Sequence, residues 1–449
     1  MLSSRFNMRL LASLVVLCTL TPAAASAQQP PTLTPELVRS RVEREWRVKA
    51  RKMRELLQPV MRRHGIDLWV IMSRENAPDP IIELFGGNGI TGWYGHRNAF
   101  LFRDPGDGKP LETHVIGTHL SGHLKLFYDK IEPYGEEGLK PHLEKYFAAA
   151  KPRKIAINQS RTISMADGLT ASLKDYLIDA IGPDYAARLT SSEPMFVEYA
   201  SLHIPEEDEI EREASLATEA ILKRAFSNEV ITPGKTRLMD VHFWITAEWK
   251  RQGFEFDFPA SLDLQRPGNV RLDDAQNPVI ERGDLLHVDF GVRNSGIVTG
   301  QQKMAYVLKA GETAPPPGLV QAFADSVRAA QLICEEIKPG RIGHEMKAAA
   351  EKKTAAAGLD VNVYSHVQGY WVHDAGVWLN PDWPERYGAH PRSKLLGGEW
   401  VSLEFSSSRV VPEWGGQRVR IMREEDLHVR KDGSQEFLSG PQNELWIVR

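Results

Sequence analysis

The sequence is poor in cysteine, has no excess of positive charge and, after its first residues, has no long apolar run. Cys18 lies in a segment that we expect to be removed, which leaves Cys334 without a partner for an internal disulfide. The 55 basic and 59 acidic residues give a net charge of −4, which provides no basic stripe for nucleic acid. These absences argue against a disulfide scaffold, a nucleic-acid-binding protein and a protein with a membrane span.

The first 27 residues have the pattern of a secretory signal peptide. Arg5 and Arg9 precede an apolar run, Leu10 to Leu20, that is too short to span a bilayer, and the small residues 25–27 form a cleavage site. Leu17 stands before Cys18, where a lipid-anchored precursor carries a small residue, so soluble export is the favoured interpretation. We therefore expect a periplasmic or extracellular protein.

The remaining length exceeds what one hydrophobic core usually serves and predicts two domains, residues 28–203 and 204–449. The first is expected to be an α/β domain. Thr34 and Pro35 predict the start of a long helix that ends near Gly65. The other elements predicted in this domain are strands at 68–72, 99–102, 114–116 and 154–157 and helices at 139–149 and 165–181.

The second domain is expected to mix strands with covering helices. Its predicted helices are 210–226, after the breaker Pro205, and then 236–252, 319–337 and 342–357, and its predicted strands are 284–292, 303–308, 400–405 and 417–421. Within two of these strands a carboxylate alternates with apolar residues, Asp289 in the first and Glu404 in the third. A carboxylate on an otherwise apolar strand is costly to bury unless a metal ion, a lysine or an arginine meets it.

Two further segments carry groups suited to chemistry. Residues 365–376 contain His366 and His373 beside Tyr370 and Trp371, and histidine is both the commonest metal ligand and the side chain that titrates nearest neutrality. The run Glu424-Glu425-Asp426 follows a strand-like stretch. Taken alone, such an acidic run is more often a solvated turn, and a lone histidine or aromatic is more often a packing residue.

Taken in order, these residues resemble the pita-bread metallopeptidase family that includes aminopeptidase P, prolidase, methionine aminopeptidase and creatinase. In that family two metal ions are held by an Asp in a D-x-G strand, an Asp eleven residues on, a His, a Glu on a later strand and a Glu near the C-terminus. Four of the five places are filled here, and the likeness continues at Arg282-Gly283-Asp284, at residues 304–307 and at residues 439–442. It spans residues 205–449, while residues 35–200 are compatible with the smaller domain of the creatinase-like branch.

The resemblance implies an α/β N-terminal domain followed by an α+β pita-bread (creatinase/aminopeptidase-like) domain. It implies a hydrolase that cleaves an amide bond near a peptide N-terminus, of the Xaa-Pro aminopeptidase or prolidase type, and a homo-oligomer, most simply a dimer. It assigns metal binding to Asp289, His366, Glu404 and Glu424, with Glu425 as the alternative to the last. It also gives catalytic roles to Glu404, as proton acceptor, and to His373, which would bind substrate beside Tyr370 and Trp371.

Two places depart from the family pattern. The second aspartate is expected at position 300, where this chain has Gly300, so a bridging ligand and its negative charge are missing. The loop before the first aspartate, residues 264–269, contains no histidine, and His242 on a predicted helix is expected to be a packing residue. We therefore expect one divalent ion (Mn, Zn, Co or Fe), held by His366, Glu404 and Glu424, in place of two.

Two alternatives remain open. One is metal-independent hydrolysis of a small amide or amidine, as in creatinase, with His373 or His366 as the base. The other is a binding protein that keeps the fold without turnover, which the losses at position 300 and in the loop favour. The retention of His366, His373, Glu404 and Glu424 opposes this second alternative.

Overall fold

A computed structural model describes residues 33–87, 96–118 and 120–449. The segment predicted to be a signal peptide lies outside the described residues. No helix within the described ranges combines the length and apolar character that a membrane crossing requires.

The N-terminal domain contains one six-stranded sheet in the order β4-β3-β2-β1-β5-β6. Strand β1 pairs antiparallel with β2 and parallel with β5, so the sheet is mixed. Its strands are β1 Leu68–Arg74, β2 Arg97–Arg103, β3 Glu112–Gly117, β4 Lys130–Pro133, β5 Ile155–Ile157 and β6 Leu189–Ser191. Its helices are α1 Pro35–Lys52, α2 Gln58–Arg63, α3 Lys140–Ala150, α4 Ala171–Ile181, α5 Pro183–Ala186 and α6 Glu193–Ala200.

Alternation along the central strands builds a core on each side of this sheet. Leu68 and Val70 on β1 pack in one cluster with residues of α3 and α4, whereas Trp69 and Ile71 pack in another with residues of α1, α2 and α6. The second cluster continues into the C-terminal domain, where it includes Trp400. The two domains therefore share buried apolar contacts.

The C-terminal domain contains a ten-stranded sheet whose main path runs β13-β15-β16-β12-β9-β7-β8, with β14 beside β15, β17 beside β16 and β18 beside β12. Its strands are β7 Ser261–Arg266, β8 Asn269–Asp273, β9 Leu285–Phe290, β12 Gln301–Val307, β13 Asp360–Val363, β14 His366–Gln368, β15 Glu399–Val411, β16 Gln417–Val429, β17 Gln435–Phe437 and β18 Trp446–Val448. A separate two-stranded hairpin, β10 Arg293–Asn294 and β11 Ile297–Val298, lies between β9 and β12 in the chain.

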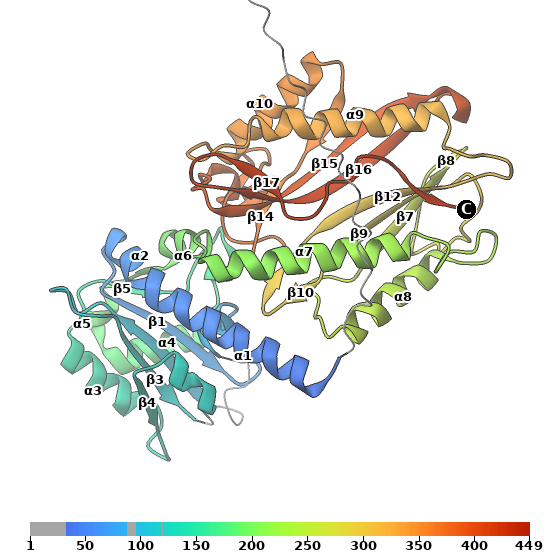
Figure 1. The fold of residues 1–449 in the computed structure, drawn as a ribbon. Coiled ribbons are helices and arrows are strands. Elements are labelled where there is room, and N and C mark those ends of the chain that lie inside the picture. The colour runs from blue at the N-terminus through green and yellow to red at the C-terminus, as the bar shows by residue number, and fades with distance from the viewer. Residues whose placement is uncertain (1–32, 88–95, 119) are drawn as a thin grey trace, which may run out of the picture.

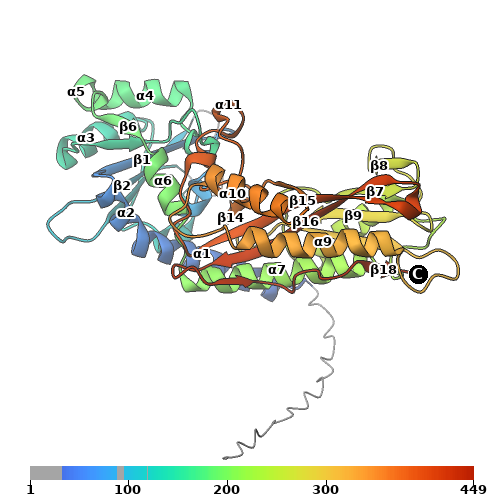
Figure 2. The same ribbon diagram turned by 90° about the horizontal axis from the view of Figure 1, so that it is seen from above.

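The helices of this domain are α7 Pro205–Ala225, α8 Leu238–Arg251, α9 Pro317–Cys334, α10 Gly343–Ala356 and the short α11 Pro384–Tyr387. Residues of α7 and α8 share a buried apolar cluster with strands β7, β9 and β12. Residues of α9 and α10 share another with β15. Figures 1 and 2 show the long helices α7 and α9 running beside the large sheet, with the N-terminal domain at one end of it.

The predicted α/β first domain and the mixed second domain are confirmed, and most predicted elements are present. The long first helix is interrupted by a π-helical turn, Met53–Leu57, before α2 and the left-handed Gly65. The helix predicted from residue 210 begins earlier, at Pro205, because proline suits the first helical turn and Glu206 and Glu207 follow it there. The boundary at residue 203 falls between the two sheets and remains a prediction.

Two predicted segments differ from the structure. The helix expected from residue 165 begins at Ala171, after Thr170 accepts a hydrogen bond from the Leu173 amide. The segment interpreted as a glycine-containing loop, residues 264–269, is the tip of the hairpin formed by β7 and β8, where Gly268 has φ +86°.

Candidate metal centre and active site

Three acidic side chains and one amide lie in a row across four neighbouring strands. Register pairs Asp289 on β9 with Gln302 on β12, Gln302 with Glu424 on β16, and Glu424 with Glu404 on β15. Oxygens of Asp289, Glu404 and Glu424 lie within 4.8 Å of one another. We call these four residues the carboxylate row.

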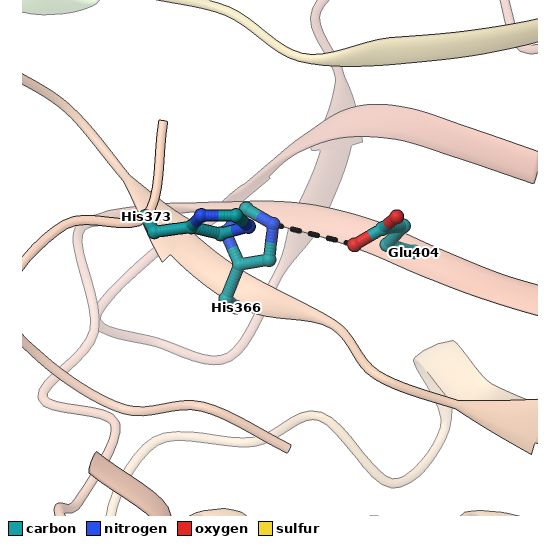
Figure 3. Close-up of side chains that lie close together, drawn as sticks. All are labelled: His366, His373 and Glu404. Carbon is teal, nitrogen blue, oxygen red and sulfur yellow. Dashed lines mark ion pairs between the residues drawn. The ribbon is translucent and has the colours of Figure 1, made fainter. Parts of the chain in front are cut away.

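Two histidines adjoin the row at Glu404. His366 lies on β14 opposite Ser402 of β15, and its Nε2 lies 3.4 Å from Glu404 Oε2 and 3.9 Å from Glu424 Oε1. His373 lies in the loop after β14, with its ring 4.4 Å from that of His366 and nearly perpendicular to it (Figure 3). His366, His373 and Glu404 offer three ligand atoms within 4.8 Å of one another.

The loop that carries His373 is held by backbone and side-chain hydrogen bonds. The Asp374 amide donates to the carbonyl oxygen of Val367 at 3.2 Å, which folds the loop back over β14. The buried Asp374 carboxyl accepts from the backbone amides of Tyr370 at 2.8 Å and Ala375 at 2.6 Å. These contacts place His373 beside His366 while leaving its side chain exposed.

Burial and crowding set the protonation of the site. Burial, together with the neighbouring Glu404, raises the pKa of Asp289 to about 7, and burial raises the pKa of Glu404 to about 7. Burial and both of these acids raise the pKa of Glu424 well above its usual range. The described part of the chain provides no lysine or arginine in an ion pair with these three acids. Three buried acids without a cationic partner from the chain would be stabilised by a bound cation.

Both histidines are neutral at neutral pH. Burial lowers the pKa of His366 to about 4, and the neighbouring His366 lowers the pKa of His373 to about 4. The Nδ1 of His366 lies 3.1 Å from the carbonyl oxygen of Val367, to which it donates. Among the described residues its buried Nε2 has no hydrogen-bond partner, although it faces Glu404 and Glu424. An orphaned imidazole nitrogen beside carboxylates fits a divalent cation.

The structure places Glu424, and not Glu425, in the row. The Glu424 Oε1 accepts a hydrogen bond from the Ser402 hydroxyl at 2.5 Å. Glu425 is bound by Lys303 and lies 3.2 Å from an Arg423 nitrogen. All three acids of the run Glu424-Glu425-Asp426 are buried within β16, unlike the solvated turn that such a run more often forms.

Position 300 lies beside the row. A Cβ built at Gly300 would lie 2.6 Å from Glu424 Oε1 and 3.2 Å from a methyl carbon of Val372. A side chain at this position would therefore enter the carboxylate cluster. Glycine leaves that space to Glu424 and contributes neither ligand atom nor charge.

Gln302 lies between Asp289 and Glu424 in the row, and sequence reasoning missed it. Its Nε2 donates to Glu404 Oε1 at 2.5 Å and lies 3.5 Å from Asp289 Oδ2. Its Oε1 lies 3.2 Å from His287 Nε2, and His287 Nδ1 lies 3.1 Å from Asp263. Only strand register could have revealed Gln302, because the β10–β11 hairpin separates it from Asp289 in the chain.

Tyr370 and Trp371 lie away from the row. The Tyr370 hydroxyl donates to Glu207 at 2.6 Å, and its ring packs beneath the Lys52 ammonium at 5.0 Å. Trp371 packs edge-on against Phe196 of the N-terminal domain. The structure thus places both aromatics at the contact between domains, which favours a packing role over the predicted pocket-lining role.

Comparisons with known proteins identify the family of the second domain and the fold of the chain. Residues 209–431 match the model of metallopeptidase family M24. The sheet and helices have the pita-bread fold, and the chain belongs to this metallopeptidase family through its second domain. A search by sequence among curated proteins finds no match.

Solved structures show the same fold over both domains. The X-Pro aminopeptidase from Thermotoga maritima MSB8 is 16% identical, with a TM-score of 0.65 over 87% of this chain and 100% of that one. The prolidase from Pyrococcus furiosus is 16% identical, with a TM-score of 0.57 over 86% and 100%. Aminopeptidase P from E. coli, in a low-pH form, is 14% identical, with a TM-score of 0.58 over 89% and 94%. At these identities the likeness establishes the fold.

Proposed function

We propose that this protein is an exported, metal-dependent hydrolase that removes or releases residues at the N-terminus of peptides, with a preference for Xaa-Pro bonds. The observation that carries the proposal is the convergence of His366, His373 and Glu404 at one edge of a buried row of acids (Figure 3). The family of the second domain and the names of the structurally similar proteins, X-Pro aminopeptidase and prolidase, support the substrate class.

The residues present suit hydrolysis with one divalent cation. When bound, such a cation lowers the pKa of a water molecule and polarises the scissile carbonyl. Neutral His366 directs its free Nε2 to the cation site, and Glu404 provides the carboxylate that accepts the proton of the attacking water. Gln302 fixes the orientation of Glu404 by donating to its Oε1.

Substrate reaches the site from the side on which His373 is exposed. Glu404 keeps 13% of its side chain accessible, whereas Glu424 keeps 3%. The accessible edge of the cluster is therefore the pair His373 and Glu404. A peptide that docks there places its first carbonyl beside both the proton acceptor and the two imidazoles.

Export is proposed from the arginines, apolar run and small-residue cleavage site within residues 1–27. Expression of the full chain followed by N-terminal sequencing of the exported protein tests it. We expect the mature chain to begin at Gln28. Retention of the full-length chain in the cytoplasm would refute export without affecting the proposed chemistry.

Turnover is tested with a set of Xaa-Pro peptides and matched Xaa-Ala peptides, on protein loaded with Mn²⁺, Zn²⁺ or Co²⁺. We expect release of the N-terminal residue from the Xaa-Pro set and a loss of about 1,000-fold in kcat for Glu404→Gln, at the level of losing a general base. Turnover by chelator-treated protein that added metal does not raise would favour a creatinase-like reaction. The absence of turnover on every peptide, with metal bound, would favour the binding-protein alternative.

A further inference from the structure

The two halves of the site differ in which ligand atoms are free. In the carboxylate row, Gln302 donates to Glu404 Oε1 and lies 3.5 Å from Asp289 Oδ2, and Ser402 donates to Glu424 Oε1. On the histidine side, His366 Nε2 is unpaired, and the described residues form no hydrogen bond to the ring of His373. Glu404 contributes to both halves, with Oε1 toward Gln302 and Oε2 toward His366.

We infer that the cation of this protein is held by His366, His373 and Glu404, and that the Gln302 amide takes the place of a second cation between Asp289 and Glu404. The inference rests on the proposed function and sharpens it. His373, which the sequence suggested as a substrate-binding residue, becomes a ligand. Asp289 and Glu424, which the sequence suggested as ligands, become supporting acids.

The ligand chemistry is consistent with this assignment. Two imidazole nitrogens and one carboxylate oxygen are a ligand set of catalytic zinc sites, and a site with three protein ligands leaves a position for water. The set has one carboxylate, so a dication there keeps a net positive charge toward the exposed side, where the substrate carbonyl would lie. His366 is fixed in the required tautomer by its Nδ1 contact with the Val367 carbonyl.

The position of Gln302 accounts for the single ion. Its amide nitrogen lies where the oxygens of Asp289 and Glu404 face each other, so it neutralises their repulsion by hydrogen bonding. Asp263 and His287 support its orientation, because His287 Nε2 lies 3.2 Å from Gln302 Oε1 and His287 Nδ1 lies 3.1 Å from Asp263, which leaves the NH₂ group turned to the acids. Gly300 has no side chain, so it offers no further carboxylate that could bind a second cation.

The test is calorimetric titration of chelator-treated protein with Zn²⁺, in the absence of substrate, on wild type, His373→Ala and Asp289→Asn. We expect one binding event in the wild type, a loss of affinity of about 100-fold or more for His373→Ala, and a change within about threefold for Asp289→Asn. The first variant changes an exposed side chain and the second is nearly isosteric, so both should fold, which circular dichroism would check.

The converse pattern, in which Asp289→Asn loses the ion and His373→Ala keeps it, would overturn the inference. Loss in both variants would also overturn it, because the ion would then span both halves. A wild type that binds no Zn²⁺ would do the same. Binding that follows the expected pattern without peptide turnover would leave the metal site standing and refute the hydrolase proposal alone.

Two further measurements test the roles of His373 and Gln302 separately. Pulsed electron paramagnetic resonance of the Cu²⁺-loaded protein counts coordinated imidazoles, and we expect two in the wild type and one in His373→Ala. Gln302→Glu replaces the amide with a fourth acid of the same shape, and we expect a second Zn²⁺ event in its titration. One imidazole in the wild type, or a single event in Gln302→Glu, would contradict the corresponding part of the inference.

Discussion

Two groups of buried acids lie next to each other on strand β16, and they are neutralised in different ways. Glu425 is bound by Lys303 and lies near Arg423, so its charge is met by cations of the chain itself. Glu424, the preceding residue, joins Asp289 and Glu404, where an amide and a hydroxyl donate hydrogen bonds and no described lysine or arginine forms an ion pair with the three acids. The first group is complete as it stands, whereas the second is suited to a cation from solution. From this difference we infer which face of the strand is functional.

The largest change in the free energy of unfolding is expected when the ion pair of Glu425 is broken. Lys303→Met leaves Glu425 buried with Arg423 as its remaining cation and the Gln442 backbone amide as a hydrogen-bond donor, and removing one member of a buried ion pair costs about 3 kcal/mol at the lower end of the usual range. Denaturant unfolding should show this loss of stability. The double variant Lys303→Met/Glu425→Gln is the control and should recover a large part of it. A loss below about 1 kcal/mol would show that the pair is not essential to the core.

A cation from solution should stabilise the second group. Saturation of the site at a concentration 100 times the Kd raises the free energy of unfolding by about 2.7 kcal/mol, because the ion binds the folded chain. Thermal unfolding with and without Zn²⁺ measures the effect, with His366→Ala as the control that should not respond. An equal response in the control would place the ion elsewhere on the protein.

A substitution at Tyr370 tests whether Glu207, another buried acid, is neutralised by the chain itself in the way that Glu425 is. Lys52 lies 3.2 Å from Glu207, and the Tyr370 hydroxyl donates to the same carboxylate. Tyr370→Phe should lower the free energy of unfolding by about 1.5 kcal/mol, the value of a hydrogen bond to a charged group, and leave the Zn²⁺ affinity unchanged. A change in metal affinity without a change in stability would show that Tyr370 belongs to the metal site and does not have a packing role alone.

The smallest change in the free energy of unfolding is expected for Glu404→Gln in chelator-treated protein. Replacing one of three crowded acids with an amide removes like-charge repulsion, so the free energy of unfolding should equal that of the wild type or exceed it by about 1 kcal/mol. Chemical denaturation in the presence of a chelator measures it. A clear loss of stability would mean that Glu404 is a structural residue, and the contrast with Lys303 would fail.

Strand alternation together with the family likeness singled out the acids and histidines that the structure brings together. Asp289 and Glu404 each alternate with apolar neighbours on predicted strands, and both lie in the row. The sequence also located the missing ligand at position 300, where the structure shows that a side chain would meet Glu424. Local pattern and family likeness carried these predictions.

Other features depended on register and on tertiary packing. Gln302 is opposite Asp289 only because an additional hairpin separates β9 from β12, and spacing alone does not give that register. The choice between Glu424 and Glu425 required the two faces of β16, which Ser402 and Lys303 distinguish. Tyr370 was assigned to the pocket because it is near His373 in the chain, yet its hydroxyl reaches Glu207 on α7.

The central claim is that Glu404, together with His366 and His373, forms a site for one divalent ion. Elemental mass spectrometry of protein purified without chelator or affinity metal tests it most directly, beside His366→Ala. We predict one ion per chain in the wild type and none in the variant. No ion in the wild type, even after incubation with Mn²⁺, Zn²⁺ or Co²⁺, would contradict the account, and two ions per chain would contradict the role of Gln302 within it.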